Sequence, residues 1–304
     1  AKQGNYREAL RGLKYEIQRQ FINNKFILDS DKLADEYKDE YKKILSMDED
    51  AVWSNSIQLL SICLKQYYGT KTIILIDEYD VPLEDAYFSG YYDEMVRFIR
   101  SLFESALKTN SALEFSVITG CLRISKESIF TGLNNLAVNS ILSNKYSESF
   151  GFVQYEVDEL MKYYNIEEKS QLMKKWYDGY LFGNREIYNP WSVANYFNNE
   201  CKPRPFWTNT SDNEIIREIM RTLTPEIADD LILLMQGKHV QTSLNMDVIY
   251  PRITDGADSI FSFLLMAGYL KPVKEAIETE IGTFMELALP NKCLLQDESM
   301  LFAR

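Results

Sequence analysis

The first half of the chain alternates between hydrophobic patterns of two periods. Apolar residues recur at helical spacing over residues 5–28 and again over residues 52–68. Two short runs of mostly β-branched and aliphatic residues, 72–77 and 113–119, are typical of strands buried in a parallel sheet. A long helical pattern over residues 89–109 separates the two runs. This alternation predicts an α/β fold, in which helices pack on a layer of parallel strands.

The pattern changes after about residue 150. Helical patterns dominate there, as over residues 155–164 and 167–177, and aromatic-rich connectors separate them. The segments "GYLKPVKEA" and "GTFMELALP" predict a short hairpin near the C-terminal end. We therefore predict an N-terminal α/β domain over residues 1–150 and a mostly helical region over residues 151–304.

Composition narrows the class of protein. The chain has 304 residues, of which 46% are hydrophobic and 13% aromatic, so it can bury a substantial core and is not disordered. A formal net charge of −12 opposes broad electrostatic binding to nucleic acid or to anionic membranes. There is neither an apolar signal core at the start nor an apolar run of about 18 residues, so we expect no membrane partner.

The cysteines give no sign of a metal site. The four of them lie far apart, no CxxC pair occurs, and His239 is the only histidine, so a zinc site is not expected. A few scattered thiols are typical of a reducing compartment, which predicts a cytoplasmic location.

The most informative stretch is "TIILIDEYD", residues 72–80. The C-terminal end of a buried parallel strand faces the ligand crevice of an α/β sheet, and Asp77 and Glu78 stand at that end. An aspartate there suits Mg²⁺, and the adjacent glutamate can orient a water for attack on a γ-phosphate. The pattern is that of a Walker B motif. The alternative is that these acids cap the next helix or end the strand in solvent.

The second strand carries further polar candidates. In "FSVITGCLR" it ends at Thr119, and Arg123 follows. Thr119 is a candidate sensor that contacts a γ-phosphate or the lytic water, and Arg123 is a candidate stabilising cation. The alternatives are that Thr119 bonds a local backbone group and that Arg123 pairs with a nearby carboxylate.

No phosphate-binding loop accompanies these residues. A P-loop requires GxxxxGK[ST] between a strand and a helix. The nearest match, "GTKT" at Gly69–Thr72, has Thr70 where the second glycine should be, and it precedes a strand.

Several long blocks resemble the bacterial AAA-ATPase-like family. They are "TIILIDEYDVPLEDAYFSGYYDEMVRFIRSLFESALKTN", "LEFSVITGCLRISKESIFTGLNNL", "KKWYDGYLFGNREIYNPWSVANYF" and "FWTNTSDNEIIREIM". They occur in order, and the resemblance runs from about residue 5 to residue 292. Longer members of the family carry a C-terminal PD-(D/E)XK-type nuclease domain.

The resemblance implies a P-loop NTPase-like core followed by a helical region with a winged-helix-like portion. It also implies roles: Asp77 as the Mg²⁺-associated acid, Glu78 as the catalytic acid, and Thr119 and Arg123 in the sensor block. It gives no role to Asp80. The blocks "WYDGY" and "YNPWSV" are family hallmarks without a known task, and their aromatic residues fit core packing better than a binding cage.

The chain departs from the family at both ends. Members begin with a strand and a phosphate-binding loop that are not in this sequence, which suggests a fragment or a truncated product with an incomplete sheet. We therefore expect an exposed apolar sheet edge, which is an aggregation hazard. The nuclease triad is not in the sequence either, since "EEK" at Glu167–Lys169 lies in a polar helical stretch.

These observations leave three functions open. The first is an AAA-like ATPase module, which in the complete protein binds ATP and Mg²⁺ and controls a linked nuclease domain or a protein partner. Without the phosphate loop we expect no hydrolysis by this chain alone. The second is a non-catalytic remnant that binds protein. The third is a nucleic-acid-binding remnant, since "KKWYDGYLFGNR" and "CKPRPFW" mix basic and aromatic residues.

Overall fold

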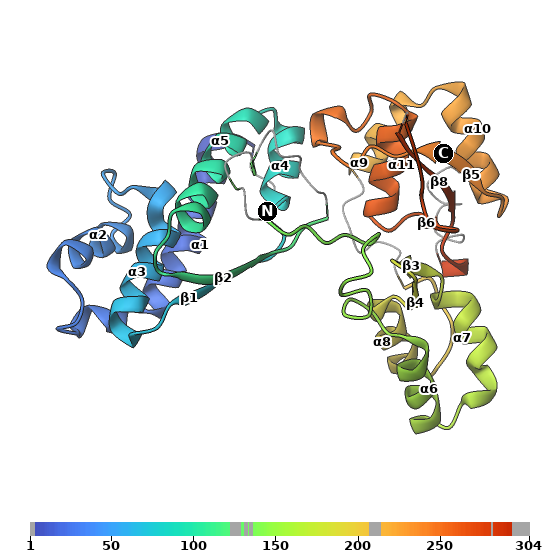
Figure 1. Cartoon of the computed structure of the whole chain (residues 1–304), viewed down its shortest axis with the longest axis horizontal. Helices are drawn as coiled ribbons and strands as arrows, with labels where there is room; N and C mark the ends of the chain where they lie inside the picture. Colours follow the sequence, from blue (N-terminus) through green and yellow to red (C-terminus); the bar gives the residue numbers. More distant parts are fainter. Residues whose placement is uncertain are drawn as a thin grey trace. The chain divides into compact units, whose positions relative to one another are not determined.

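Two compact units make up the computed structural model (Figure 1). Unit 1 comprises Ala1–Leu136 with Ile249–Pro251, and unit 2 comprises Ala137–Val248 with Arg252–Arg304. These units are defined by contacts within the chain, and they do not test the predicted domain boundary at residue 150. That boundary stays a prediction. The structure describes residues 4–121, 129–130, 133, 136–206, 214–280 and 282–293.

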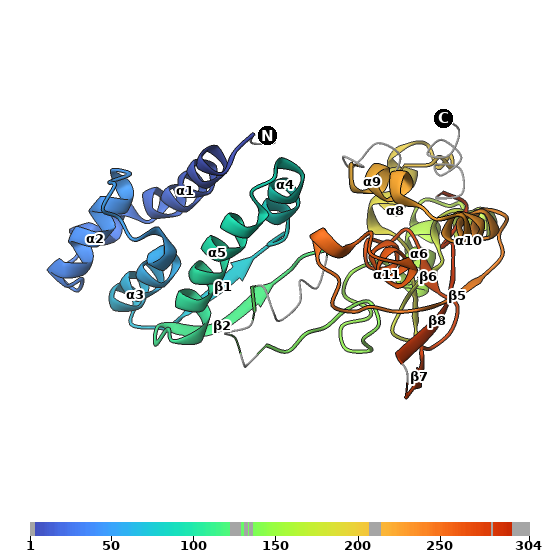
Figure 2. The same ribbon diagram turned by 90° about the horizontal axis from the view of Figure 1, so that it is seen from above.

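Unit 1 is built from helices that pack on one another and on a small sheet. Figures 1 and 2 show α1, α3 and α5 side by side. The helical segments before the sheet are α1 (Tyr6–Asn23), η1 (Lys25–Asp29), α2 (Asp35–Leu45), η2 (Trp53–Asn55) and α3 (Ser56–Tyr68). The predicted helices over 5–28 and 52–68 are thus confirmed, and Gly69 ends α3 in the left-handed conformation at φ +75°.

A buried cluster holds α1, α2 and α3 together. Phe21 of α1 and Tyr41 of α2 are fully buried in it, with ring centroids 4.6 Å apart. The Tyr41 hydroxyl donates a hydrogen bond of 2.7 Å to the carbonyl oxygen of Phe21. A buried tyrosine whose hydroxyl is satisfied in this way fixes how the two helices pack.

The two predicted strands form a parallel pair, which confirms the α/β class. β1 (Thr72–Ile76) pairs with β2 (Leu113–Ile118), with Leu75 opposite Val117. The crossover between them contains α4 (Val81–Ser89), α5 (Tyr92–Phe103) and the π-helical turn η3 (Glu104–Lys108). The predicted helix over 89–109 corresponds to α5 and η3, whereas α4 lies before it and was not predicted; Gly90 at φ +78° ends α4. The P-loop-like fold itself stays a prediction.

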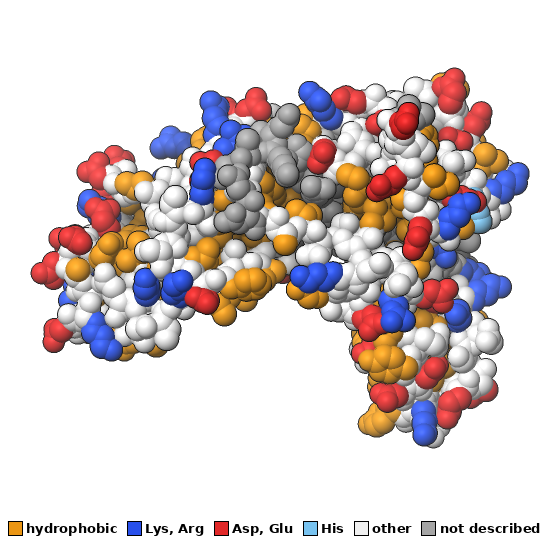
Figure 3. Space-filling view, in the orientation of Figure 1, with side chains coloured by type: hydrophobic (Ala, Val, Ile, Leu, Met, Phe, Trp, Pro, Cys, Tyr) orange, Lys and Arg blue, Asp and Glu red, His pale blue; other side chains and the backbone are white. Residues whose placement is uncertain are grey.

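One face of this sheet is exposed, so the prediction of fully buried strands is wrong for that face. Ile73 is 63% exposed, Leu75 72% and Phe115 59%, whereas Ile74 on the other face is buried. Alternate residues of a strand point to opposite faces, and the described helices of unit 1 cover one of them. The outward side chains of Ile73, Leu75, Phe115 and Val117 are called the bare sheet face below. Figure 3 shows hydrophobic side chains gathered along this part of unit 1.

Unit 2 begins with helices around an aromatic core. Tyr177, Tyr188 and Tyr196 are all fully buried there. The predicted helices over 155–164 and 167–177 are confirmed, and Glu167–Lys169 forms a short 3-10 helix rather than a strand. The helical segments are α6 (Gln154–Tyr163), η4 (Glu167–Lys169), α7 (Ser170–Tyr177), α8 (Pro190–Asn198), α9 (Glu214–Thr222), α10 (Pro225–Met235) and α11 (Ala257–Met266).

The strands of unit 2 are antiparallel. A hairpin, β3 (Tyr180–Phe182) and β4 (Arg185–Ile187), occupies a stretch that the sequence pattern had suggested to be a connector. A second sheet contains β5 (Val240–Ser243), β6 (Lys271–Pro272), β7 (Ile277–Thr279) and β8 (Gly282–Ala288). The predicted C-terminal hairpin is confirmed, since β6 and β7 both pair with β8. The winged-helix-like portion stays a prediction.

No helix among the described residues combines the length and the apolar character that crossing a bilayer requires.

Candidate functional site

The carboxyl ends of β1 and β2 lie side by side. Ile76, the last residue of β1, is in register with Ile118, the last residue of β2. Two backbone hydrogen bonds continue the pairing beyond the strands: Thr119 N–H donates to the Ile76 carbonyl at 2.9 Å, and Tyr79 N–H donates to the Thr119 carbonyl at 3.0 Å. The parallel pairing therefore brings the polar residues that follow the two strands to one edge.

Asp77 and Thr119 touch at this edge. The Thr119 hydroxyl donates a hydrogen bond to Oδ1 of Asp77. The backbone N–H of Glu78 lies 3.1 Å from the same carboxylate oxygen and 3.4 Å from the Thr119 hydroxyl oxygen. The carboxylates of Asp77 and Glu78 are both exposed. Three of the four residues selected from the sequence thus lie together and face solvent.

Glu78 has an unusual backbone conformation. Its φ is +52°, in the left-handed region that residues with a side chain rarely adopt. Such a conformation costs on the order of 1 kcal/mol and is held by surrounding contacts. Here the hydrogen bonds that Glu78 and Tyr79 make to the end of β2 hold it.

Asp80, to which the sequence gave no role, is the buried acid of the "DEYD" stretch. It is 2% exposed, and its Oδ2 accepts a hydrogen bond of 2.8 Å from the backbone N–H of Cys121. Gly120 has no room for a Cβ, which would clash with the Tyr79 ring and lie 2.9 Å from Oδ1 of Asp80. The hydrogen bond of Asp80 and the close approach at Gly120 thus hold the loop after β1 against the loop after β2. The sequence signal that could have identified Asp80 is its position, since it is an acid between a predicted strand and a helix.

The oxygen atoms at the carboxyl ends of β1 and β2 suit one kind of metal ion. No group of three or more His, Cys, Asp or Glu side chains that could hold a metal ion occurs among the described residues. Asp77 and Thr119 offer one carboxylate and one hydroxyl. Mg²⁺ fits such a sparse set, because it keeps several waters and takes its other oxygens from phosphates. Arg123, the predicted stabilising cation, lies outside the described residues.

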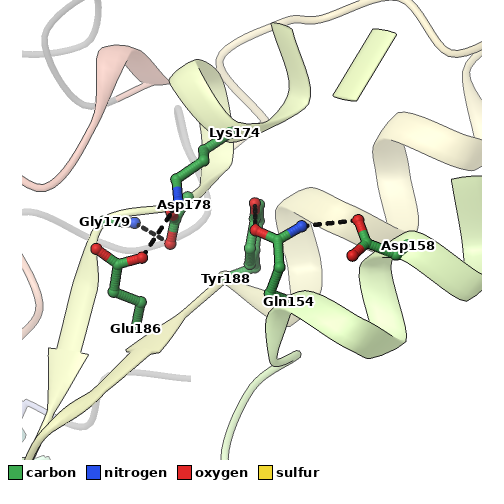
Figure 4. Close-up of polar contacts among 7 residues, drawn as sticks. All are labelled: Gln154, Asp158, Lys174, Asp178, Gly179, Glu186 and Tyr188. Carbon is green, nitrogen blue, oxygen red and sulfur yellow. Dashed lines mark hydrogen bonds and ion pairs between the residues drawn. The ribbon is translucent and has the colours of Figure 1, made fainter. Parts of the chain in front are cut away.

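The "WYDGY" block forms a separate polar cluster in unit 2 (Figure 4). Asp178 is buried, accepts a hydrogen bond of 2.7 Å from Gly179 N–H, and lies 3.4 Å from Lys174 Nζ. Burial raises the pKa of Asp178 above its ordinary value. Lys174 also pairs with Glu186 at 3.2 Å, and this hydrogen bond raises the pKa of Lys174.

Most aromatic residues of the "WYDGY" and "YNPWSV" blocks pack in the core, which supports the core-packing interpretation for them, whereas Trp191 is 57% exposed. Trp176, Tyr177, Tyr180 and Tyr188 are all buried. Tyr188 donates a hydrogen bond of 2.7 Å to Oε1 of Gln154, as Figure 4 shows. These rings pack in the core of unit 2 and stabilise it.

Comparison with known proteins supports the family resemblance. A family model described as a predicted AAA-ATPase matches residues 10–130. That segment contains Asp77, Glu78 and Thr119, so the resemblance to the AAA-ATPase-like family is confirmed there.

A curated protein is distantly similar to this chain. It is a protein of Azotobacter chroococcum mcd 1 described as "Uncharacterized protein in vnfD 5'region", and it is 26% identical over 163 residues. The match covers 52% of this chain and 31% of the relative, so the chain spans less than a third of the length of this relative. No solved structure matches the chain.

Proposed function

We propose that the AAA-ATPase-like segment over residues 10–130 belongs to an ATPase module. In this proposal Mg-ATP is hydrolysed at the carboxyl ends of β1 and β2. One observation carries the proposal: the Thr119 hydroxyl bonds the Asp77 carboxylate across two parallel strands. Ligands of open α/β sheets bind at the carboxyl ends of the strands, and both residues stand at such ends.

Each residue has a distinct task in this proposal. Asp77 would hold Mg²⁺, which neutralises the charge that develops on the phosphates. Glu78 accepts a hydrogen bond from the attacking water and so orients it. Thr119 positions the Asp77 carboxylate, and its hydroxyl can also bond the water. The left-handed backbone of Glu78 supports this assignment, because conformational strain of this kind concentrates at functional sites.

The sequence has no phosphate-binding loop of the GxxxxGK[ST] pattern. The nearest match to such a loop, Gly69–Thr72, leads into the N-terminal end of β1, whereas Asp77 follows the C-terminal end of that strand. Without backbone donors and a lysine around the phosphates, the residues of this chain alone give too little stabilisation for hydrolysis. We therefore propose this activity for a natural protein that also supplies such a loop, and control of a linked nuclease or partner is part of the proposal.

ATP turnover by that natural protein tests the proposal. Glu78→Gln keeps the shape of the side chain and removes the carboxylate, so we expect phosphate release to fall roughly 10²- to 10⁴-fold. The matched control is Glu114→Gln, which should leave turnover unchanged. Glu114 is an exposed acid near the N-terminal end of β2, at the opposite end of the same strands. Equal turnover in wild type and Glu78→Gln removes Glu78 from the reaction.

A protein-binding function is the second candidate, and the bare sheet face favours it. Ile73, Leu75 and Phe115 present large apolar side chains to solvent on adjacent strands. Contiguous apolar surface of this kind is typical of protein interfaces. Binding of nucleic acid stays a prediction, and the burial of Trp176 and Tyr177 removes two of the aromatic rings that suggested it.

A further inference from the structure

Unit 2 contains a cavity that the proposed ATPase site does not use. Its volume is about 140 Å³, and it lies between the β3–β4 hairpin and the turn that connects α11 to β6. Tyr180 and Phe182 come from the hairpin, Leu265 and Met266 from the end of α11, and Lys271 from β6. All of these residues belong to unit 2.

The walls of the cavity are mainly apolar and aromatic. The rings of Tyr180 and Phe182 lie 6.4 Å apart with their planes inclined at 60°. Phe150 also lines the cavity and is 67% exposed, so the cavity opens to solvent beside it. Such a site, which is concave, mostly apolar and bounded by a few polar groups, is the usual form of a small-molecule site.

Lys271 is the one charged residue among the described residues that line the cavity. Its side chain is half-buried, and in the described part of the chain it has no carboxylate partner. Lys274, three residues further on, is exposed and pairs with Glu286 at 2.8 Å. A partly buried ammonium without a counter-ion is unfavourable, so an anion that enters the cavity is stabilised.

Asn189 adds a hydrogen-bond donor to the same cavity. Its Oδ1 accepts a hydrogen bond of 2.9 Å from Ser192 N–H and thereby caps α8. Its side-chain NH₂ group has no acceptor among the described residues. The side chains of Asn189 and Lys271 therefore both offer donors, and this favours a ligand with an acceptor group.

We propose that this cavity binds a small monocarboxylate whose apolar part is about the size of one benzene ring. Cavities of about 150 Å³ with apolar walls accept benzene, which matches the volume found here. The carboxylate pairs with Lys271 and accepts from the Asn189 amide, and the ring packs on Tyr180 and Phe182. The ligand is either a free acid or the carboxyl-terminal residue of a peptide, because both present the same groups. The proposal is independent of the ATPase function.

Calorimetric titration of the whole chain with benzoate tests the proposal. We expect saturable binding with a Kd on the order of 1 mM or lower, and binding of the uncharged benzamide at least roughly tenfold weaker. Lys271→Met should weaken benzoate at least about tenfold and leave benzamide unchanged. Lys274→Met is the matched control and should bind benzoate like wild type. Lys271→Arg keeps the charge and should retain binding, which guards against a Met variant that fails to fold.

Two further arms complete the test. Ala267→Leu places a larger side chain in the cavity wall and should abolish binding of both compounds. An acetylated peptide that ends in phenylalanine separates the two sources: tighter binding than benzoate identifies a chain terminus, and weaker binding identifies a free acid. Three results overturn the proposal: no saturable binding of benzoate or of the peptide at about 10 mM, equal affinity for benzoate and benzamide, or unchanged affinity in Lys271→Met.

Discussion

The backbone N–H of Cys121 donates a hydrogen bond of 2.8 Å to the carboxylate of Asp80, across 41 residues of sequence. This contact ties the loop that follows β2 to the loop that follows β1. The Asp80 carboxylate is buried, so the bond forms away from water, where a charged acceptor is strong. Asp77 and Thr119 owe their proximity to the strand pairing and to this tie between the loops.

Removing the Asp80 carboxylate should destabilise unit 1. Asp80→Ala leaves the Cys121 N–H without its acceptor, and we expect the free energy of unfolding to fall by about 2–3 kcal/mol. Asp80→Asn keeps an acceptor oxygen and should cost less. Urea denaturation measures both variants. A loss below about 0.5 kcal/mol in Asp80→Ala would show that the contact contributes little.

The Thr119 hydroxyl should matter for turnover more than for stability. Its bond to Asp77 lies at an exposed edge, so Thr119→Val should change the free energy of unfolding by less than about 1 kcal/mol. In the natural protein, however, the same variant should lower ATP turnover at least roughly tenfold, because Asp77 loses the group that orients it. Thr119→Ser retains the hydroxyl and should retain turnover. Full activity in Thr119→Val contradicts the role assigned to this residue.

The bare sheet face should tolerate charge. Leu75 is largely exposed, so Leu75→Lys should cost less than about 0.5 kcal/mol and should reduce self-association of the 304-residue chain in light scattering. Ile74→Lys, one residue away on the buried face, is the matched control and should cost several-fold more. If both variants destabilise the chain equally, another part of the protein covers the face.

Asp178 should make stability depend on pH. Burial raises the pKa of Asp178 above its ordinary value of 3.8, so the folded state holds the proton more tightly than the unfolded state does. The free energy of unfolding therefore loses a contribution as pH rises from 3.8 to the folded pKa. Asp178→Asn removes this loss and keeps an acceptor for Gly179 N–H, so its stability relative to wild type should improve with rising pH.

Urea denaturation followed by tryptophan fluorescence between about pH 4 and pH 7 measures the effect of Asp178→Asn. Asp158→Asn is the control, since this carboxylate is exposed and accepts a hydrogen bond of 2.8 Å from Gln154 in the same cluster. A difference between Asp178→Asn and wild type that does not change with pH argues against burial as the dominant influence on Asp178.

Local sequence patterns predicted most helices and strands of unit 1. They did not predict helix α4 or the exposure of one face of the sheet. The strand at Thr72–Ile76 and its parallel partner were predictable, because continuous apolar runs flanked by helical patterns leave few alternatives. The short helix α4 was not predicted, since the helical pattern recognised in the sequence began at residue 89, where α4 ends. Exposure of Leu75 was also unforeseen, because an apolar strand has the same sequence whether one face or both are covered.

The sequence by itself determined that Asp77 and Glu78 come directly after one strand and Thr119 directly after another, because this depends on residue order and period alone. Only the tertiary structure decided that Thr119 bonds Asp77, that Asp80 is buried against Cys121, and that Lys271 lines an apolar cavity. These contacts join residues far apart along the chain. Strand register, close approach at Gly120 and the packing of the β3–β4 hairpin fix them, and all three depend on the chain as a whole.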